Sequence, residues 1–286
     1  MASLSFCTPA CFFGARMSDA LFSASPSHLY FHPHPALKKY IAHYTLSPPC
    51  VSGPAHLTLI PDASGCLVFA FGPSGIQAHF WGPTTHTVEV YNDFKQTPYR
   101  FFVEFLPGGA HQLLGLSVKD AVDLRIPLAD ADAALYSAFL ALFSKSSCMH
   151  TLLAGIDALF CQNINSEKTD SLAEQLLCCL HAPTTSLSSE SLSKTLHYSA
   201  RHLSRRIQPV LGLSLRQYLR LQRINHALAG MGQTPSLSYL AQTLGYYDQA
   251  HFNHDFKSVC GVSPTVYQQK LSDFYKETHK FPTTLF

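Results

Sequence analysis

The sequence is poor in charged residues and has no long apolar run. Charged side chains make up 13% of the 286 residues, the formal net charge is +2, and 47% of the residues are hydrophobic. This composition excludes a disordered polyelectrolyte and supplies enough apolar residues for two packed cores. No segment reaches the ~18 consecutive apolar residues of a membrane-spanning helix, so no membrane association is expected.

Paired cysteine motifs are also missing. The nine cysteines are odd in number and include no C-x-x-C pair. Such usage argues against a disulfide framework and favours a reducing compartment, so a cytoplasmic location is expected. The N-terminal segment lacks a charged region followed by a clean apolar core. A signal peptide is therefore not expected, and residues 1–25 are predicted to form a disordered tail.

Short β-type segments separated by turn residues dominate residues 26–125. The five runs, rich in Val, Ile, Phe and Tyr, are LTLI (57–60), CLVFAF (66–71), IQAHFW (76–81), HTVEVY (86–91) and YRFFVEF (99–105). Gly, Pro, Asn or Asp separates them, which is typical of a small sandwich or barrel. A helix over residues 36–44 is expected to precede these strands.

Beyond residue 125 the apolar spacing becomes helical. Residues 126–185 are expected to form a helical connector, with helices over 133–143, 149–160 and 172–180 and a linker in HAPTTSLSS (181–189). Residues 186–270 have helical spacing throughout, and residues 271–286 are a C-terminal tail. The expected fold class is therefore α+β, with an N-terminal β-barrel or sandwich, a helical connector and a C-terminal all-α domain.

The C-terminal segment carries most of the positive charge. Residues 186–270 contain nine basic and three acidic side chains, a net charge of +6, although the whole chain carries only +2. The remaining residues therefore carry a net charge of −4. Such asymmetry predicts that this segment binds a polyanion.

The same segment contains an internal repeat at a distance of 49 residues. The matching pairs are Ser199 and Asp248, Leu203 and Phe252, Ile207 and Phe256, Gly212 and Gly261, Ser214 and Ser263, and Tyr218 and Tyr267. Before the turn the distance is 48 residues, because HYS in the first copy corresponds to GYYD in the second. A repeat with this length suggests two copies of one supersecondary unit.

Each copy is interpreted as a helix-turn-helix. In the second copy Gly245 is placed to end the first helix, Asp248 is placed to cap the next helix, and Phe252 and Phe256 face the core. Residues 215–229 between the copies predict one linker helix about 22 Å long. Pro209 is expected to end or kink the first recognition helix after Gln208, because proline lacks an N–H and its ring clashes with the preceding turn.

The outer face of each second helix is polar or basic and suits the major groove of DNA. If there were only one copy, this face could equally be an ordinary solvent-exposed surface. Two copies in the same register on a basic segment favour DNA binding instead. Two recognition helices about one turn of DNA apart, ~34 Å, would let a monomer occupy successive major grooves.

These residues resemble the AraC-type transcriptional regulators of bacteria. The resemblance covers residues 187–267 and is strongest in LAQTLGYYDQAHFNHDFKSVCGVSPTVY. LIPDASGCLVFAFG and RFFVEFLPGGAHQLLGL are more weakly similar to the sensor-side domains of one branch of this family. The resemblance implies base contacts from Arg201, Ser204, Arg205, Gln249, Ala250, Asn253 and His254.

The family also implies promoter DNA as the partner and activation as the direction of control. A small-molecule effector at the β domain, RNA polymerase and a second copy of the chain are further candidate partners. The first copy departs from the family where it carries Ser193 and His197 in place of small Ala and Gly. It is expected to be less stable than the second copy.

Three rival functions compete with DNA binding. His251, His254 and Asp255 would be a metal site, but Asp255 is expected on another side of the helix from His251. A cupin-like barrel would be a metal enzyme through His56, His79, His86 and Glu89, and a basic helical domain would also serve as a protein–protein adaptor. No triad, Cys/His pair or phosphate loop is recognisable, so no enzymatic activity, cofactor or metal is expected.

Overall fold

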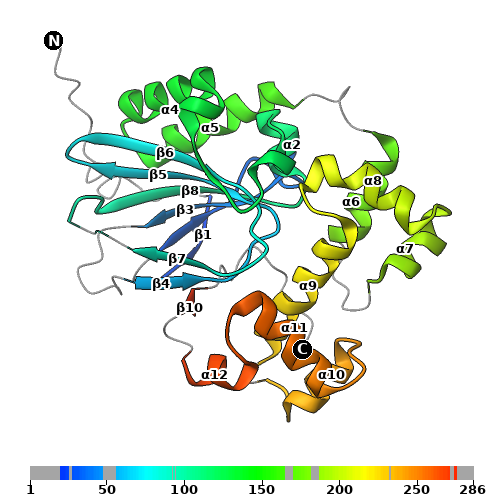
Figure 1. Cartoon of the computed structure of the whole chain (residues 1–286). Helices are drawn as coiled ribbons and strands as arrows, with labels where there is room; N and C mark the ends of the chain where they lie inside the picture. The colour runs from blue at the N-terminus through cyan, green and yellow to red at the C-terminus, as the bar shows by residue number, and fades with distance from the viewer. Residues whose placement is uncertain are drawn as a thin grey trace.

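The computed structural model describes residues 20–25, 28–47, 56–91, 93, 95–164, 170–181, 187–231 and 233–270, together with the backbone of residues 274–275. Within these residues the chain forms an N-terminal β domain and a C-terminal helical domain (Figure 1). Each domain has its own cluster of buried apolar side chains. The predicted α+β class is therefore confirmed.

A seven-stranded antiparallel sheet is the centre of the β domain. Its strand order is β1 (Leu21–Ala24), β2 (Leu29–Phe31), β3 (Ile41–Ser47), β8 (Tyr99–Phe105), β5 (Cys66–Gly72), β6 (Gly75–Trp81) and β9 (Arg125–Pro127). A smaller sheet has the order β10 (Phe274–Tyr275), β4 (His56–Leu59) and β7 (Val88–Tyr91), with β10 parallel to β4. It lies below the larger sheet in Figure 1. The arrangement of the described strands is sandwich-like, without closing into a barrel.

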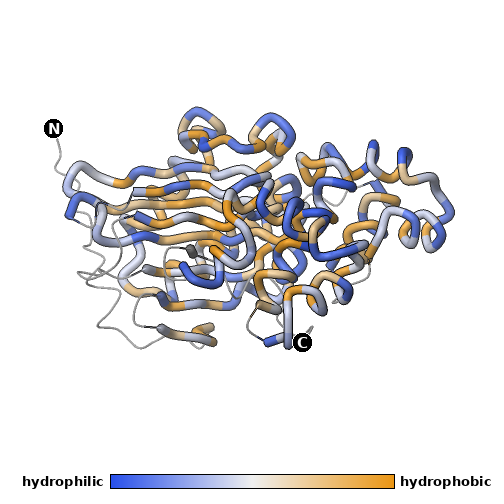
Figure 2. Tube along the Cα trace, turned by 60° about the horizontal axis from the view of Figure 1, so that its bottom comes forward, coloured by the Kyte–Doolittle hydropathy of each residue, from blue (hydrophilic) through white to orange (hydrophobic). Residues whose placement is uncertain are grey.

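The alternation of side chains along the strands places an aromatic core on one face of the large sheet. Phe101, Val103 and Phe105 of β8 are buried on that face. Helices α4 (Ala133–Lys145) and α5 (Met149–Asn163) cover it, as Figure 1 shows above the sheet. The ring centroids of Phe69 and Phe139 are 4.6 Å apart. The apolar strands are visible as the orange segments that run through the sheet in Figure 2.

Several short elements connect the strands and helices of the β domain. They are the 3-10 turns η1 (Pro35–Leu37) and η2 (Val118–Ala121) and the helices α2 (Gly109–Leu114) and α3 (Leu128–Ala131). The helix predicted over residues 36–44 was wrong, because the chain makes one 3-10 turn and then enters β3. In β3 the side chains alternate between two buried faces, so nearly every residue is buried and the period of two is hidden in the sequence.

The two predicted tails contain short strands. Residues 21–24 were expected in a disordered tail, but β1 pairs with β2 at the edge of the large sheet. Residues 274–275 were also expected in a tail and pair with β4. Residues 1–19, 271–273 and 276–286 lie outside the described residues, as does most of the predicted linker, residues 182–186.

Seven helices build the described part of the C-terminal domain: α6 (Ser171–His181), α7 (Ser189–Leu196), α8 (Ala200–Leu211), α9 (Leu215–Gly230), α10 (Leu237–Thr243), α11 (Gln249–Cys260) and α12 (Pro264–Gln269). Helix α6 was expected in the connector, yet its apolar face packs into the core of this domain. The connector is thus divided, since α4 and α5 pack on the β domain instead.

Pro209 was predicted to end or kink α8 after Gln208, and the helix does not end there. It continues through Pro209 to Leu211. Val210 and Leu211 are buried, and the N–H of Gly212 donates to the carbonyl of Gln208 at 2.8 Å. Burial of the last turn and this C-terminal cap offset the hydrogen bond that proline cannot make.

The helical domain rests directly on the β domain. Ile60 and Ala63 of the β domain belong to the apolar cluster of the helices. The side-chain amide of Asn225 donates to the carbonyl of Pro61 at 3.3 Å, and the N–H of Thr87 donates to the carbonyl of Val259 at 3.1 Å. Among the described residues no helix is long and apolar enough to cross a membrane.

Candidate nucleic-acid interface

The first helix-turn-helix consists of α7 and α8. Ser188 caps α7 by accepting a hydrogen bond from the N–H of Ser191, and Ser199 caps α8 by accepting one from His202. Between the helices His197 has a φ of +58°, in the left-handed region that favours glycine. Leu203, on the inner face of α8, is fully buried.

The second helix-turn-helix consists of α10 and α11 and repeats this geometry. Its residues at the turn and at the helix cap suit their backbone positions better than those of the first copy do. Gly245 has a φ of +76° at the position that His197 occupies in the first copy. The carboxylate of Asp248 accepts from the N–H of His251 at 2.7 Å, where it also favours the positive end of the helix dipole. Phe252 and Phe256 are fully buried, with ring centroids 5.7 Å apart.

The repeat found in the sequence is a structural repeat. Gly212 and Gly261 end their recognition helices with φ values of +77° and +75°. Beyond these glycines, Ser214 caps α9 and Ser263 caps α12. The core positions Tyr218 and Tyr267 are both buried. The α7–α8–α9 unit and the α10–α11–α12 unit are therefore equivalent.

The predicted base-reading residues of α8 differ in their surroundings. Arg201 and Arg205 are exposed in the first half of the helix. One Nη of Arg205 lies 3.5 Å from Nδ1 of His202. Ser204 is partly buried, and its hydroxyl oxygen accepts from the N–H of Leu215 at 3.2 Å. The hydroxyl oxygen is thus used at the start of α9, and the hydroxyl hydrogen of Ser204 is left as a donor.

The predicted residues of α11 divide in the same way. Ala250 and His254 are exposed, four residues apart on one face. Gln249 is partly buried, and its Oε1 accepts from the hydroxyl of Ser238 at 2.5 Å. Asn253 is also partly buried, and its Oδ1 has no hydrogen-bond partner within the described parts of the chain.

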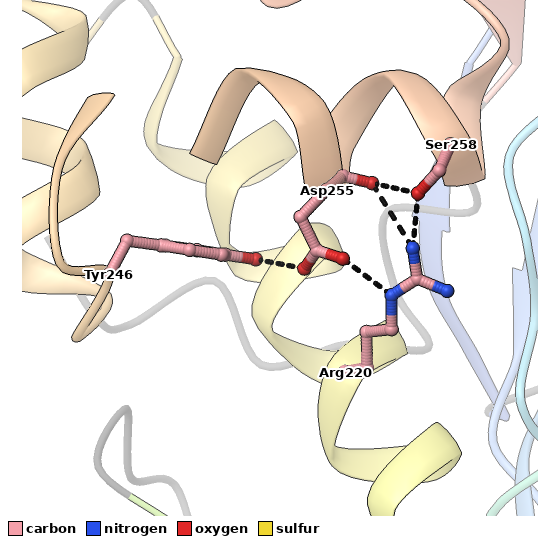
Figure 3. Close-up of polar contacts among 4 residues, drawn as sticks. All are labelled: Arg220, Tyr246, Asp255 and Ser258. Carbon is pink, nitrogen blue, oxygen red and sulfur yellow. Dashed lines mark hydrogen bonds and ion pairs between the residues drawn. The ribbon is translucent and has the colours of Figure 1, made fainter. Parts of the chain in front are cut away.

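A polar network missed by the sequence reasoning joins the linker helix to α11 (Figure 3). Nε of Arg220 lies 2.6 Å from Oδ1 of Asp255, and the hydroxyl of Tyr246 donates to Oδ2 of Asp255 at 2.7 Å. Arg220 also donates to the hydroxyl of Ser258. Burial and then the hydrogen bond to Asp255 raise the pKa of Tyr246, so its proton stays on the phenol.

This network changes the interpretation of Asp255. Its carboxylate is directed at α9 and the turn before α11, whereas His254 is exposed. Within the described residues no group of three or more His, Cys, Asp or Glu side chains could hold a metal ion. The signal in the sequence was one acidic residue in the middle of a basic segment, which indicates an internal ion pair.

Internal pairs also reduce the number of basic side chains free to bind a polyanion. Nε of Arg206 is 2.6 Å from Asp170, Lys194 is 2.8 Å from Glu190, and Arg223 lies over the ring of Tyr246. Among the described residues, those basic side chains of the segment that have no ion pair and no ring contact are Arg201, Arg205, Arg216, Lys257 and Lys270.

The C-terminal ends of both recognition helices face the β domain. A Cβ at Gly212 would lie 2.8 Å from the carbonyl oxygen of Val118, and Val259 accepts a hydrogen bond from Thr87. Arg201, Arg205, Ala250 and His254 lie in the first halves of these helices. These exposed positions are therefore at the ends of α8 and α11 that are directed away from the β domain.

A family model described as a helix-turn-helix domain matches residues 192–270. The chain carries an AraC-type helix-turn-helix domain. The resemblance drawn from the sequence is thus confirmed. Residues 30–127, which include most of the large sheet, match a domain of unknown function (DUF6597).

A curated protein is similar to part of this chain. The chain is 33% identical over 84 residues to the uncharacterized HTH-type transcriptional regulator YisR of Bacillus subtilis. The aligned region spans 29% of each chain, so the match is limited to less than a third of this curated relative.

Solved structures are also similar to parts of the chain. The C-terminal domain of AraT, a response regulator from Geobacillus stearothermophilus, is 26% identical with a TM-score of 0.32, covering 39% of this chain and 93% of that chain. ToxT from Vibrio cholerae is 13% identical with a TM-score of 0.36, covering 80% of this chain and 89% of that chain.

Proposed function

We propose that this protein is a sequence-specific DNA-binding transcriptional regulator of the cytoplasm. The observation that carries the proposal is the paired helix-turn-helix, with two recognition helices in equivalent positions on either side of α9. The 16 residues of α9 span about 24 Å. A link of that length, together with the width of each module, is compatible with two successive major grooves of one duplex.

In this proposal the seven predicted residues form the DNA-facing edge. Arg201 and Arg205 have free guanidinium donors for guanine, and His254 and the methyl group of Ala250 face base edges in the second groove. Ser204 contributes its O–H donor. Gln249 and Asn253 contribute the N–H donors of their side-chain amides. Lys257 and Arg216 contact phosphates.

We propose that the protein activates transcription by contacting RNA polymerase. The β domain, which the family comparison leaves without an assigned function, is the proposed location of a small-molecule effector and of contact with a second copy. Its contacts with the helical domain, among them those at Pro61, Thr87 and Val118, supply a physical route by which a change in the β domain would reach both recognition helices.

The test is a selection from random duplexes with the purified full chain, followed by anisotropy titrations of selected and random duplexes. We expect affinity for the selected duplex to exceed that for random duplexes by at least about 10³-fold at physiological salt. Both affinities should fall with added salt, because phosphate contacts release counterions. Equal affinity for both duplexes at every salt concentration would contradict the proposal and leave the protein–protein adaptor as the better one.

A further inference from the structure

The large sheet carries polar residues on the face opposite its aromatic core. In the strand register His43 faces Glu104, Glu104 faces Cys66, Cys66 faces Trp81, and Trp81 faces Arg125. Residues that face one another on neighbouring strands point to the same side of a sheet. These five side chains therefore form one row across the sheet. The next row consists of Thr45, Phe102, Val68, His79 and Pro127.

Two side chains at the β6–β9 end of these rows, Trp81 and His79, hold the guanidinium of Arg125 in a fixed place. The guanidinium carbon of Arg125 lies 5.3 Å from the ring centroid of Trp81. One Nη of Arg125 lies 3.2 Å from Nδ1 of His79. Burial and then the charge of Arg125 lower the pKa of His79, so the neutral imidazole accepts this hydrogen bond. The other guanidinium N–H groups have no hydrogen-bond partner in the described chain and keep their planar fork.

The charge of Arg125 is not balanced within the described residues, because no carboxylate lies within ion-pair distance of it. The acidic residue nearest in sequence is Asp123. Its carboxylate instead accepts from the N–H and the hydroxyl of Thr85, both at 2.7 Å, and lies 3.5 Å from His86. Arg125 is exposed at this end of the sheet, so its unpaired charge is open to an anion from solution. A guanidinium held against an aromatic ring without a counter-charge is well placed to bind an anion.

A second observation comes from Trp81 itself. Its indole Nε1 is buried, and it has no hydrogen-bond acceptor among the residues that the structure describes. Buried donors are nearly always paired in native proteins, so such an exception indicates a missing partner. Phe102 and Val68 lie on the same face in the neighbouring strands and add apolar surface. The cluster thus combines a cationic fork, an unpaired donor and an apolar wall.

We propose that Arg125, His79 and Trp81 form a binding site for a small organic carboxylate. The guanidinium fork binds the two carboxylate oxygens side by side, in the bidentate geometry that arginine favours. The apolar body of the ligand lies along Trp81 and its neighbours on the sheet. An inorganic oxyanion would contact only the guanidinium. An organic anion also contacts the apolar surface beside it, and the site therefore favours an organic anion. The site belongs to the β domain and does not depend on DNA binding.

Trp81 makes the site directly measurable, because it is the single tryptophan of the chain. The full chain is titrated with benzoate, and in parallel with inorganic phosphate, at constant ionic strength in chloride. We expect benzoate to cause a saturable change in tryptophan fluorescence and a matching rise in the midpoint of thermal unfolding. Phosphate should bind more weakly than benzoate by about tenfold or more, since it gains nothing from the apolar wall.

Two variants and one control make the test specific. Arg125→Gln should weaken benzoate binding by about tenfold or more, and Arg125→Lys should give an intermediate value because it keeps the charge without the fork. Lys119→Gln, which removes one charge from an exposed position of the same domain, should bind as the unmodified protein does. Thermal unfolding of each variant without ligand shows that it is folded.

The proposal is overturned if benzoate changes neither the fluorescence nor the unfolding midpoint, or if Arg125→Gln and the unmodified protein respond equally. Binding of phosphate with an affinity equal to or above that of benzoate would overturn the assignment to organic carboxylates. Each of these outcomes leaves the DNA-binding measurements unaffected, so failure of this inference is distinguishable from failure of the proposed regulatory function.

Discussion

Arg220 and Asp255 connect the linker helix to the second recognition helix through a contact of 2.6 Å between Nε and Oδ1. Asp255 is largely buried, whereas Arg220 is about one-third exposed. The pair is joined by Tyr246, whose hydroxyl binds the second carboxylate oxygen. This carboxylate therefore helps to fix the orientation of α11 relative to α9, together with the apolar core that the two helices share.

The first prediction concerns this ion pair. Asp255→Asn should lower the free energy of unfolding of the helical domain by about 1–2 kcal/mol, a value reduced from that of a fully buried pair because Arg220 is partly in solvent. Chemical denaturation followed by circular dichroism measures this change. In a double-mutant cycle with Arg220→Gln, the two effects should be less than additive. Strict additivity would mean that the two side chains do not interact.

The second prediction uses the difference between His197 and Gly245, which both have positive φ values. His197→Gly should stabilise the first module by about 0.5–1 kcal/mol, because glycine adopts this conformation without steric cost. Gly245→Ala, where the structure leaves room for the added Cβ, should destabilise the second module by about 1–2 kcal/mol. Thermal unfolding of both variants checks the pair. A destabilised His197→Gly protein would show that the histidine side chain matters more than its backbone.

The third prediction follows from the buried thiol of Cys260. Burial, followed by the charge of Asp255, raises the pKa of Cys260 from 9.0 to about 12. Since the folded pKa lies above the unfolded value, the thiol favours folding below pH 9, and this contribution should decline as the pH rises from 9 toward 12. At pH 8 Cys260 should react with iodoacetamide much more slowly than the exposed Cys178. Peptide mapping of the labelled protein measures both rates. Similar rates would contradict the burial of Cys260 in α11.

The fourth prediction tests the core of the second module. Phe252→Ala should lower its free energy of unfolding by about 3–5 kcal/mol, because it removes a fully buried ring that contacts Phe256 and Tyr246. His254→Ala, on the exposed face of the same helix, is the matched control and should change stability by less than about 0.5 kcal/mol. An equal effect of the two substitutions would be incompatible with the inner and outer faces of α11 assigned above.

The sequence predicted the helical domain well because its signals are local. Caps such as Asp248, the turn at Gly245 and the four-residue spacing of Phe252 and Phe256 act within one helix or its neighbour. Their repetition at 49 residues added independent support. The five β-runs of the N-terminal domain were found for the same reason, since turn residues separate them.

Contacts between distant residues could not be predicted in this way. Strand β3 was taken for a helix because both of its faces are buried, which depends on the two layers that pack against it. The side-chain oxygens of Ser204 and Gln249 bind Leu215 and Ser238 across the packed helices, and the sequence did not predict these contacts. The pair of Arg220 and Asp255 is separated by 35 positions and forms only when α9 and α11 meet.

The fifth prediction distinguishes base reading from phosphate contact. Arg205→Ala should weaken binding to a selected duplex by about 1–3 kcal/mol and relax the preference at one base pair, with little effect on random DNA. Arg206→Ala is the neighbouring control, because Arg206 is paired with Asp170 and directed toward the start of α6. It should leave the sequence preference unchanged. Equal losses on selected and random duplexes would mean that Arg205 contacts only the phosphate backbone.

The most direct measurement of the central claim is hydroxyl-radical footprinting of the full chain on a selected duplex. If α8 and α11 occupy successive major grooves, one bound chain should protect two regions whose centres lie about 10 base pairs apart. Arg201→Ala combined with Arg205→Ala should remove one region, and Ala250→Glu combined with His254→Glu should remove the other. A single protected region, or no protection that depends on sequence, would contradict the account.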